Sequence, residues 1–145
     1  MTEPEGKLGI LRGTFGFDAF RPGQEEIVDD LLAGRHVLAV MPTGSGKSLC
    51  YWVPALVLGG LTVIVSPLIA LMQDQVAALK LAGVAAETIN SSQSRDDNVA
   101  AWRRAANGEL RLLYLAPERL MTGRMIAALQ KLDAPSLLPW GAMVR

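Results

Sequence analysis

The stretch MPTGSGKS, residues 41–48, constrains the fold of this 145-residue chain more than any other feature. The apolar run VLAVM (residues 37–41) leads into it, and the helix-compatible stretch LCYWVPAL (residues 49–56) follows it. Backbone N–H groups of a glycine-rich loop can surround phosphate oxygens, and a helix that begins there adds free amides and its dipole. The order of strand, loop and helix therefore predicts a phosphate-binding loop in a parallel α/β domain.

The side chains of this loop predict what it binds. Lys47 can bring a positive charge to the β and γ phosphates of a nucleotide, and the Ser48 hydroxyl can ligate the Mg²⁺ between them. Position 41 is methionine where the strict pattern has glycine. The alternative is an ordinary glycine turn with Lys47 in solvent. The predicted nucleotide contacts are Thr43, Gly44, Ser45, Gly46, Lys47 and Ser48, with Ser48 as the metal ligand.

Composition limits the class of protein. Half of the residues are hydrophobic, and the 14 basic and 14 acidic side chains cancel, so the chain does not have the composition of a disordered segment. A single cysteine excludes a disulfide scaffold and a four-cysteine zinc site, and it favours a reducing compartment. The longest apolar run, residues 53–65, is shorter than the ~20 residues of a membrane span, and the N-terminus has no secretory signal pattern. We therefore expect a cytoplasmic protein without membrane contact.

Short β-rich runs alternate with segments of helical period, which predicts parallel strands joined by crossover helices. The expected strands are residues 37–41, 62–66, 86–89 and 111–115. A helix should begin near Pro22 and end at Gly34, and the last strand would leave a sheet edge open to another strand. The predicted apolar faces of the later helices are Leu68, Leu71, Met72, Val76 and Leu79; Val99, Trp102 and Ala106; and Met125, Leu129 and Leu132.

The segment GTFGFDAFRPGQ, residues 13–24, carries a second candidate for nucleotide contact. Phe17 offers an aromatic plane, Arg21 a guanidinium, and Gln24 an amide that complements the amino group and N7 of adenine. The alternative is that the phenylalanines are core residues at the start of a helix and that Gln24 lies in solvent.

Four blocks together resemble the RecQ family of superfamily 2 DNA helicases over residues 8–132: FGFDAFRPGQ, VMPTGSGKSLCYWVPAL, TVIVSPLIALMQDQV and LLYLAPERL. The resemblance implies a RecA-like P-loop parallel sheet with flanking helices, here truncated, and ATP-dependent 3′ to 5′ DNA unwinding in the intact enzyme. It implies that Phe17 stacks on adenine, that Arg21 and Gln24 contact the nucleotide, and that Met41 is normal for the family's loop. ATP and Mg²⁺ are the implied cofactors.

Residues at the ends of the later strands are candidates for DNA contact. Ser66 and Pro67 follow one strand, and Pro117 and Arg119 follow another, so they should lie at the ligand-binding edge of an open α/β sheet, where phosphates of a single strand could be held. The resemblance implies that both blocks contact the tracking DNA strand and that the loop with Asn90 and Ser91 acts similarly. The alternative for Glu118 and Arg119 is a charge pair at a helix start.

The resemblance also implies a D-E-x-H block, whose acidic residues hold Mg²⁺ and orient the attacking water. The chain contains no Asp-Glu dipeptide, and residues 134–145 read APSLLPWGAMVR. We therefore assign no catalytic residue. Residues 1–132 are interpreted as part of a first RecA-like ATP-binding domain, and residues 133–145 as an irregular tail in place of the D-E-x-H region. A shortened chain and a change of reading frame near residue 133 account for this equally well.

The sequence thus predicts the N-terminal part of an ATP-dependent DNA helicase. Its expected partners are single-stranded and duplex DNA and the remaining helicase domains of the intact protein. We expect the 145-residue chain by itself to be inactive in unwinding and to hydrolyse ATP negligibly. Two alternatives remain open: a P-loop phosphotransferase, and a non-catalytic nucleotide- or DNA-binding module.

Overall fold

The structure is a computed structural model that describes residues 6–35, 37, 47–120, 123–130 and 142–143. The chain divides into two compact units, Met1–Gly59 and Gly60–Arg145, and each is described by itself. The expected strand at residues 37–41 falls outside the described residues apart from Val37, which is not in a strand. No helix in the described ranges has the length and apolar character needed to cross a membrane.

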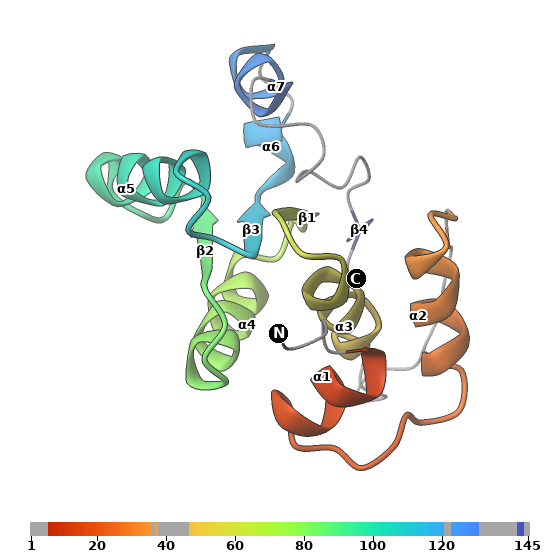
Figure 1. The fold of residues 1–145 in the computed structure, drawn as a ribbon. Coiled ribbons are helices and arrows are strands. Elements are labelled where there is room, and N and C mark those ends of the chain that lie inside the picture. Colours follow the sequence, from red (N-terminus) through yellow and green to blue (C-terminus); the bar gives the residue numbers. More distant parts are fainter. Residues whose placement is uncertain (1–5, 36, 38–46, 121–122, 131–141, 144–145) are drawn as a thin grey trace. The chain divides into compact units, whose positions relative to one another are not determined.

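The described residues of the first unit form three helices: α1 (Lys7–Gly13), α2 (Gln24–Leu32) and α3 (Leu49–Leu58) (Figure 1). The helix expected near Pro22 is α2, which has Glu25 and Glu26 in its first turn, where carboxylates favour the helix dipole. Gly23 precedes it with φ of 86°, a left-handed conformation that glycine adopts without strain.

Apolar residues from all three helices form the core of this unit. Leu11 of α1, Val28 of α2 and Val53 of α3 are fully buried, and Phe15 stacks on Trp52 with ring centroids 5.5 Å apart. At the surface, Lys7 Nζ joins α1 to α2 through ion pairs with Glu25 Oε2 (3.0 Å) and Asp29 Oδ1 (2.6 Å). Its hydrogen bonds to Asp29 and then to Glu25 raise the pKa of Lys7.

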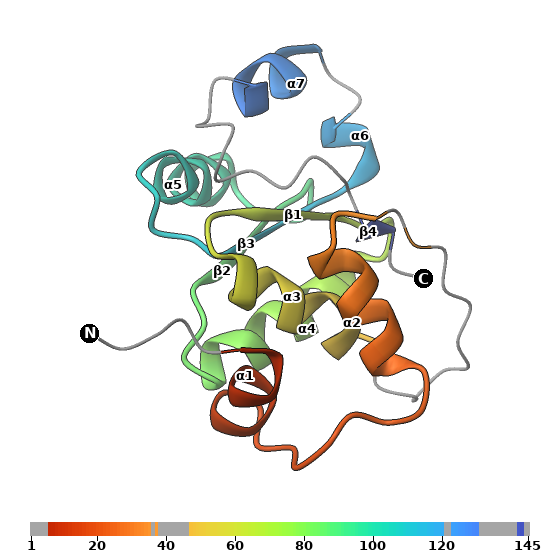
Figure 2. The ribbon, with the colours of Figure 1, turned by 45° about the vertical axis from the view of Figure 1, so that its right-hand side comes forward.

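The second unit is a parallel sheet with helices on both faces (Figure 2). The strands of the sheet are β1 (Thr62–Val65), β2 (Ala86–Ile89), β3 (Leu112–Leu115) and β4 (Ala142–Met143), in the order β2-β3-β1-β4. The helices of the unit are α4 (Ile69–Leu81), α5 (Arg95–Ala106), α6 (Pro117–Leu120) and α7 (Gly123–Gln130). The α/β class and the strands after residue 60 are therefore confirmed.

The position of β3 corrects one expectation. Residues 111–115 were expected to leave an open sheet edge, but β3 pairs in parallel with β1 on one side and with β2 on the other. Crossover connections place strands out of chain order, so the last strand in sequence need not be an edge strand. The short β4, which pairs with Ile64 and Val65 of β1, lies in the segment expected to be irregular. The rest of that segment falls outside the described residues.

Successive residues of β3 point to opposite faces, and each face packs against a different helix. Leu113 and Leu115 belong to a core cluster with Ala101 and Ala105 of α5. Between them in sequence, Tyr114 donates a hydrogen bond from its hydroxyl to Gln75 Oε1 of α4 over 2.7 Å. The helices α4 and α5 therefore cover opposite faces of the sheet.

The apolar faces of α4 and α5 were predicted only in part. Met72, Val76 and Leu79 of α4 are buried as expected, whereas Leu68 is 50% exposed, because it precedes the helix with extended backbone angles. In α5 the predicted Val99 and Ala106 are exposed, and the buried positions are Asn98, Ala101 and Ala105. Each buried position precedes a predicted one by one residue, so the observed buried face is shifted by one residue from the predicted face. Met125 of α7 and Trp102 pack against the core cluster.

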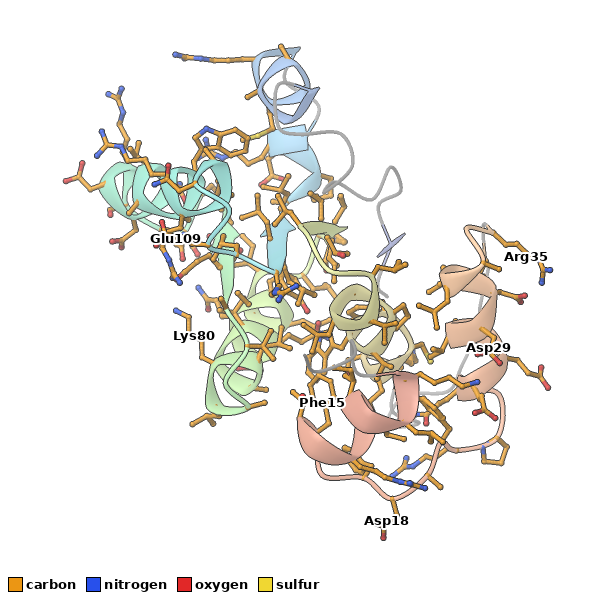
Figure 3. The ribbon with its side chains drawn as sticks, viewed as in Figure 1. Phe15, Asp18, Asp29, Arg35, Lys80 and Glu109 are labelled. Atoms are coloured by element: carbon orange, nitrogen blue, oxygen red, sulfur yellow. The ribbon has the colours of Figure 1, made fainter. Side chains whose placement is uncertain are left out.

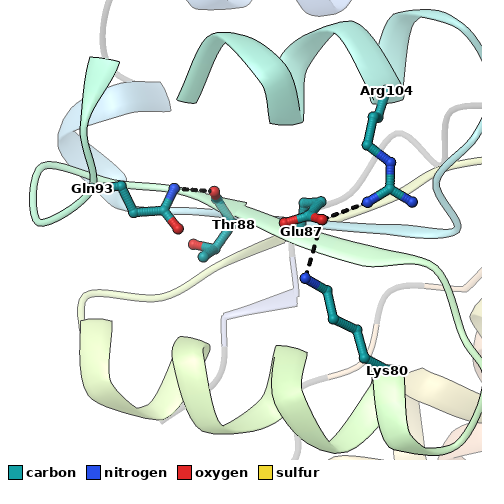
Figure 4. A network of polar contacts seen from close by, with 5 residues as sticks. All are labelled: Lys80, Glu87, Thr88, Gln93 and Arg104. Carbon is teal, nitrogen blue, oxygen red and sulfur yellow. Dashed lines mark hydrogen bonds and ion pairs between the residues drawn. The ribbon is translucent and has the colours of Figure 1, made fainter. Parts of the chain in front are cut away.

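An ion-pair cluster fixes both helices to the edge strand β2 (Figure 4). Glu87 Oε1 lies 3.2 Å from Lys80 Nζ of α4 and also accepts a hydrogen bond from Arg104 Nη1 of α5. One carboxylate thus joins helices from the two faces of the sheet.

Candidate functional site

Lys47 and Ser48 stand immediately before α3, and both are half-buried. Their backbone carbonyls accept hydrogen bonds from Cys50 N (3.0 Å) and Trp52 N (2.9 Å), which begins the helix. The first turn of α3 contains no acidic residue, and the Ser48 side chain does not cap it. A helix start with a lysine and a serine but no carboxylate suits a phosphate group. The preceding loop residues Met41, Thr43, Gly44, Ser45 and Gly46 lie outside the described residues.

Gln24 begins α2 but does not lie in solvent. It is only 1% exposed, and its Oε1 accepts a hydrogen bond from Arg21 N over 2.7 Å. Arg21 O in turn accepts a hydrogen bond from Gln24 N at 3.0 Å. The alternative of a solvated Gln24 is therefore wrong. The two residues that the resemblance assigns to the nucleotide are linked directly to each other.

Phe17 differs from the other two phenylalanines. Phe15 and Phe20 pack against the core of the first unit, as the core alternative expected, whereas Phe17 is 46% exposed. Two hydrogen bonds fix the loop that carries it: Phe17 N donates to Leu11 O (3.1 Å), and Arg12 Nε donates to Asp18 O (2.9 Å). Asp18 lies at the outer end of this loop (Figure 3). An exposed aromatic ring on a fixed loop can stack on a planar base without first ordering the backbone.

Cys50 is close in sequence to the phosphate-binding loop but is not available for chemistry. It is buried in the first turn of α3. Burial raises the pKa of its thiol, which keeps the thiol in its protonated, unreactive form.

In the second unit, three loops lie side by side at the carboxyl edge of the sheet. Ser66, Asn90 and Ala116 each follow one of the neighbouring strands β1, β2 and β3. Ser66 N donates to Leu115 O (3.1 Å), and Ala116 N donates to Ile89 O (3.5 Å), so the hydrogen-bonded ladder continues into these loops. The structure therefore brings the three sequence blocks with predicted DNA contacts to one edge.

The residues predicted to contact DNA in these loops differ in their solvent exposure. Pro67 and Ser91 are exposed, and Pro117 and Arg119 are half-buried at the short helix α6. Ser66 is 1% exposed, and its Oγ accepts a hydrogen bond from Leu68 N at 3.2 Å. Its hydroxyl therefore helps to form the turn into α4. The exposed parts of the β1 loop begin at Pro67.

The Asn90 side chain is also engaged within the protein. Asn90 has no exposed surface; its Nδ2 donates to Thr88 Oγ1 (3.1 Å), and its Oδ1 accepts from Ser92 N (2.9 Å) and Ser92 Oγ (2.6 Å). In this structure the side chain of Asn90 shapes the loop, and the neighbouring Ser91 is the residue that the loop exposes.

Sequence reasoning missed two residues that hold these loops. Arg12 fixes the loop of Phe17, and Asn98 of α5 bonds to Asn90. Asn98 could have been found from its spacing. Ala101 and Ala105 follow it at helical intervals, so it stands on the face of the helix that is buried. No comparable signal marks Arg12. Among the described residues, no group of three or more His, Cys, Asp and Glu side chains could hold a metal ion.

Comparison with known proteins shows which family the chain resembles. The family model for DEAD/DEAH box helicases matches residues 21–138. The ATP-dependent DNA helicase RecQ of Haemophilus influenzae is 47% identical over 115 residues, which cover 79% of this chain and 19% of that protein. The RecQ helicase of Bacillus subtilis is 43% identical over 127 residues, covering 87% of this chain and 22% of that protein.

A solved structure shares the fold. The DUF1998 helicase MrfA, crystallised with DNA and AMPPNP, superimposes with a TM-score of 0.67 at 20% sequence identity, over 94% of this chain and 20% of that one. At that identity the likeness concerns the fold alone. The parallel sheet and its covering helices are thus an arrangement that this chain shares with that helicase.

The chain belongs to the DEAD/DEAH box helicase family. Within that family it is similar to RecQ helicases. The chain spans about a fifth of the length of the curated relatives it matches, 19% of the Haemophilus protein and 22% of the Bacillus protein.

Proposed function

We propose that this chain provides the ATP-binding and single-strand-contacting part of an ATP-dependent DNA helicase of the RecQ type. One observation carries the DNA part of the proposal: the loops after β1, β2 and β3 lie in a row at the carboxyl edge of the sheet and expose Pro67 and Ser91, with Arg119 half-buried beside them. The hydroxyl of Ser91 and the guanidinium of Arg119 are groups that suit the phosphate backbone of an extended nucleic-acid strand.

In the nucleotide part, the residues have separate roles. Lys47 and the N-terminus of α3 hold the phosphates, and Ser48 ligates Mg²⁺. Phe17 provides the stacking surface for adenine, while Gln24 and Arg21 form the turn beside it. Bound ATP supplies the free energy that drives strand movement in the intact enzyme, where the further helicase domains complete the machinery.

A second candidate function is a nucleotide- and DNA-binding module without hydrolysis. The observation that favours it is the absence of an Asp-Glu dipeptide in the sequence, because the acidic pair of a helicase holds Mg²⁺ and orients the attacking water. The two candidates share both binding activities and differ in ATP turnover.

The test is the affinity of the chain for a fluorescent oligothymidine strand, measured by anisotropy at several salt concentrations. We expect binding that weakens as salt rises, because phosphate contacts release counterions. Arg119→Ala should weaken binding roughly tenfold, or about 1.4 kcal/mol. Arg103→Ala, which removes an exposed arginine from α5, is the matched control. Equal effects of the two variants would contradict the assignment of the α6 loop.

ATP turnover by the intact protein separates the two candidates, because this chain by itself is expected to hydrolyse ATP negligibly under either of them. A DNA-stimulated release of phosphate by the intact protein would favour the enzyme, whereas ATP and DNA binding without release would favour the module.

A further inference from the structure

The loop after β2 is held by a dense polar network centred on α5. Asn98 Oδ1 accepts hydrogen bonds from Asn90 N (3.2 Å) and from Gln93 Nε2 (2.8 Å). Asn98 Nδ2 donates to Asn90 O at 2.9 Å. Gln93 Nε2 also reaches back to Thr88 O in the strand, at 2.7 Å (Figure 4). One buried side chain thus holds both ends of the loop formed by residues 90–93.

We propose that Asn98 is a positioning residue for nucleic-acid contact: it holds the backbone of residues 90–93 in the shape that presents Ser91 to the phosphate of a single strand. The inference deepens the proposed function and rests on it. Asn98 itself touches no ligand, because it is 8% exposed and its amide is bonded to the loop.

The side chains of this loop are used unequally. Asn90 and Gln93 direct their amides inward, and the Ser92 hydroxyl donates to Asn90 Oδ1 and accepts a hydrogen bond from Gln73 Nε2 (3.3 Å). The Ser91 side chain is exposed and makes no hydrogen bond to any described residue. The network therefore leaves one hydroxyl of the loop available to a ligand.

The support for this loop is rigid. Asn98 lies one turn into α5, whose N-terminus is capped by Ser94 Oγ accepting from Asp97 N at 3.1 Å. The same face of α5 buries Ala101 and Ala105 against the sheet. An asparagine buried among alanines on this face costs desolvation that its hydrogen bonds must offset. Packing alone would be served by an apolar side chain, so the amide is explained by the loop that it holds.

Binding of labelled oligothymidine to the full chain tests the proposal. Asn98→Ala should weaken binding roughly three- to tenfold, and Ser91→Ala should weaken it to a similar or smaller degree. Because Asn98 acts through Ser91, the double variant should bind no more weakly than Asn98→Ala. Full additivity of the two effects, or unchanged binding by Asn98→Ala, would overturn the proposal.

Controls separate positioning from general stability. Tyr114→Phe removes a hydrogen bond to Gln75 in the same unit without touching the loop, and it should lower the unfolding temperature while leaving DNA affinity unchanged. If Asn98→Ala fails to fold, Gln93→Ala replaces it in the test. This variant removes the hydrogen bonds from Gln93 Nε2 to Asn98 Oδ1 and to Thr88 O, and it should show the same non-additivity with Ser91→Ala. Additive effects there would overturn the proposal equally.

The wild-type chain distinguishes this inference from the function on which it rests. Failure of the wild type to bind the strand would overturn both. Tight wild-type binding that none of the loop variants alters would overturn the role of Asn98 alone.

Discussion

The backbone N–H of Arg21 donates a 2.7 Å hydrogen bond to Oε1 of Gln24, whose side chain is almost completely buried at 1% exposure. This bond closes the turn that leads into α2. The amide that the sequence predicts to contact adenine is therefore also part of the turn that places Arg21. Replacing Gln24 should for this reason change both the stability of the turn and the binding of the base.

Replacing Gln24 should reduce both stability and base selectivity. In Gln24→Ala the Arg21 N–H loses its acceptor, which costs about 1–3 kcal/mol of unfolding free energy. The chain should also discriminate less between ATP and GTP, because the amide that complements adenine is gone. Urea unfolding and competition binding measure the two effects. A variant of lower stability that keeps full selectivity would assign Gln24 a purely structural role.

Phe17 and Phe15 should respond in opposite ways. Phe17→Ala removes an exposed ring, so stability should change by less than about 0.5 kcal/mol, while affinity for ATP falls. Phe15→Ala removes the ring stacked on Trp52, so the unfolding free energy should fall by about 2 kcal/mol or more. Calorimetry with and without nucleotide separates the effects. Equal loss of ATP affinity in the two variants, at equal folded fraction, would argue against stacking on Phe17.

The Glu87 cluster should contribute more to stability than an ordinary surface pair. Glu87→Gln breaks contacts to Lys80 and Arg104 at a carboxylate whose side chain is 21% exposed, and we expect a loss of about 1 kcal/mol. Asp30→Asn is the control, because it breaks an exposed ion pair: the Arg35 side chain is 70% exposed and the Asp30 side chain 42%. It should lower the unfolding free energy by less than about 0.5 kcal/mol. High salt should reduce both losses.

Cys50 should react slowly with alkylating reagents while the chain is folded. Burial raises the pKa of the thiol, so little thiolate forms near neutral pH, and the rate should rise sharply on unfolding. At pH values just above the pKa of the thiol in the unfolded chain, the unfolded chain loses this proton and the folded chain keeps it. Stability should therefore be unaffected by this group at neutral pH and fall as pH rises above that value. Rapid labelling of the native chain at neutral pH would contradict the buried position.

Much of the second unit could be predicted because its strands are short runs rich in residues that favour β-structure, separated by segments of helical period. The strand Ala86–Ile89 was predicted with its observed bounds, and Thr62–Val65 and Leu112–Leu115 within one residue. The central place of β3 could not be predicted from order along the chain, since crossovers rearrange the strands.

The site was less predictable than the fold, because its side chains act through backbone atoms. Sequence identified Phe17, Arg21 and Gln24 as a group but not that Arg12 holds the Phe17 loop through Asp18 O. It identified both Asn90 and Ser91 as contact residues but not that the Asn90 side chain is buried and only Ser91 is exposed. Every residue has a backbone carbonyl, so the sequence does not indicate which carbonyl accepts a hydrogen bond from a given side chain.

Binding of ATP by the chain and by its Lys47→Ala variant tests the central claim most directly. Titration of a fluorescent ATP analogue in the presence of Mg²⁺ should show saturable binding to the wild type and a loss of at least about tenfold in Lys47→Ala, or about 1.4 kcal/mol. Lys80→Ala, which removes a lysine from α4, is the matched control and should bind as the wild type does. Equal affinity of the wild type and Lys47→Ala would contradict every assignment of the nucleotide to this loop.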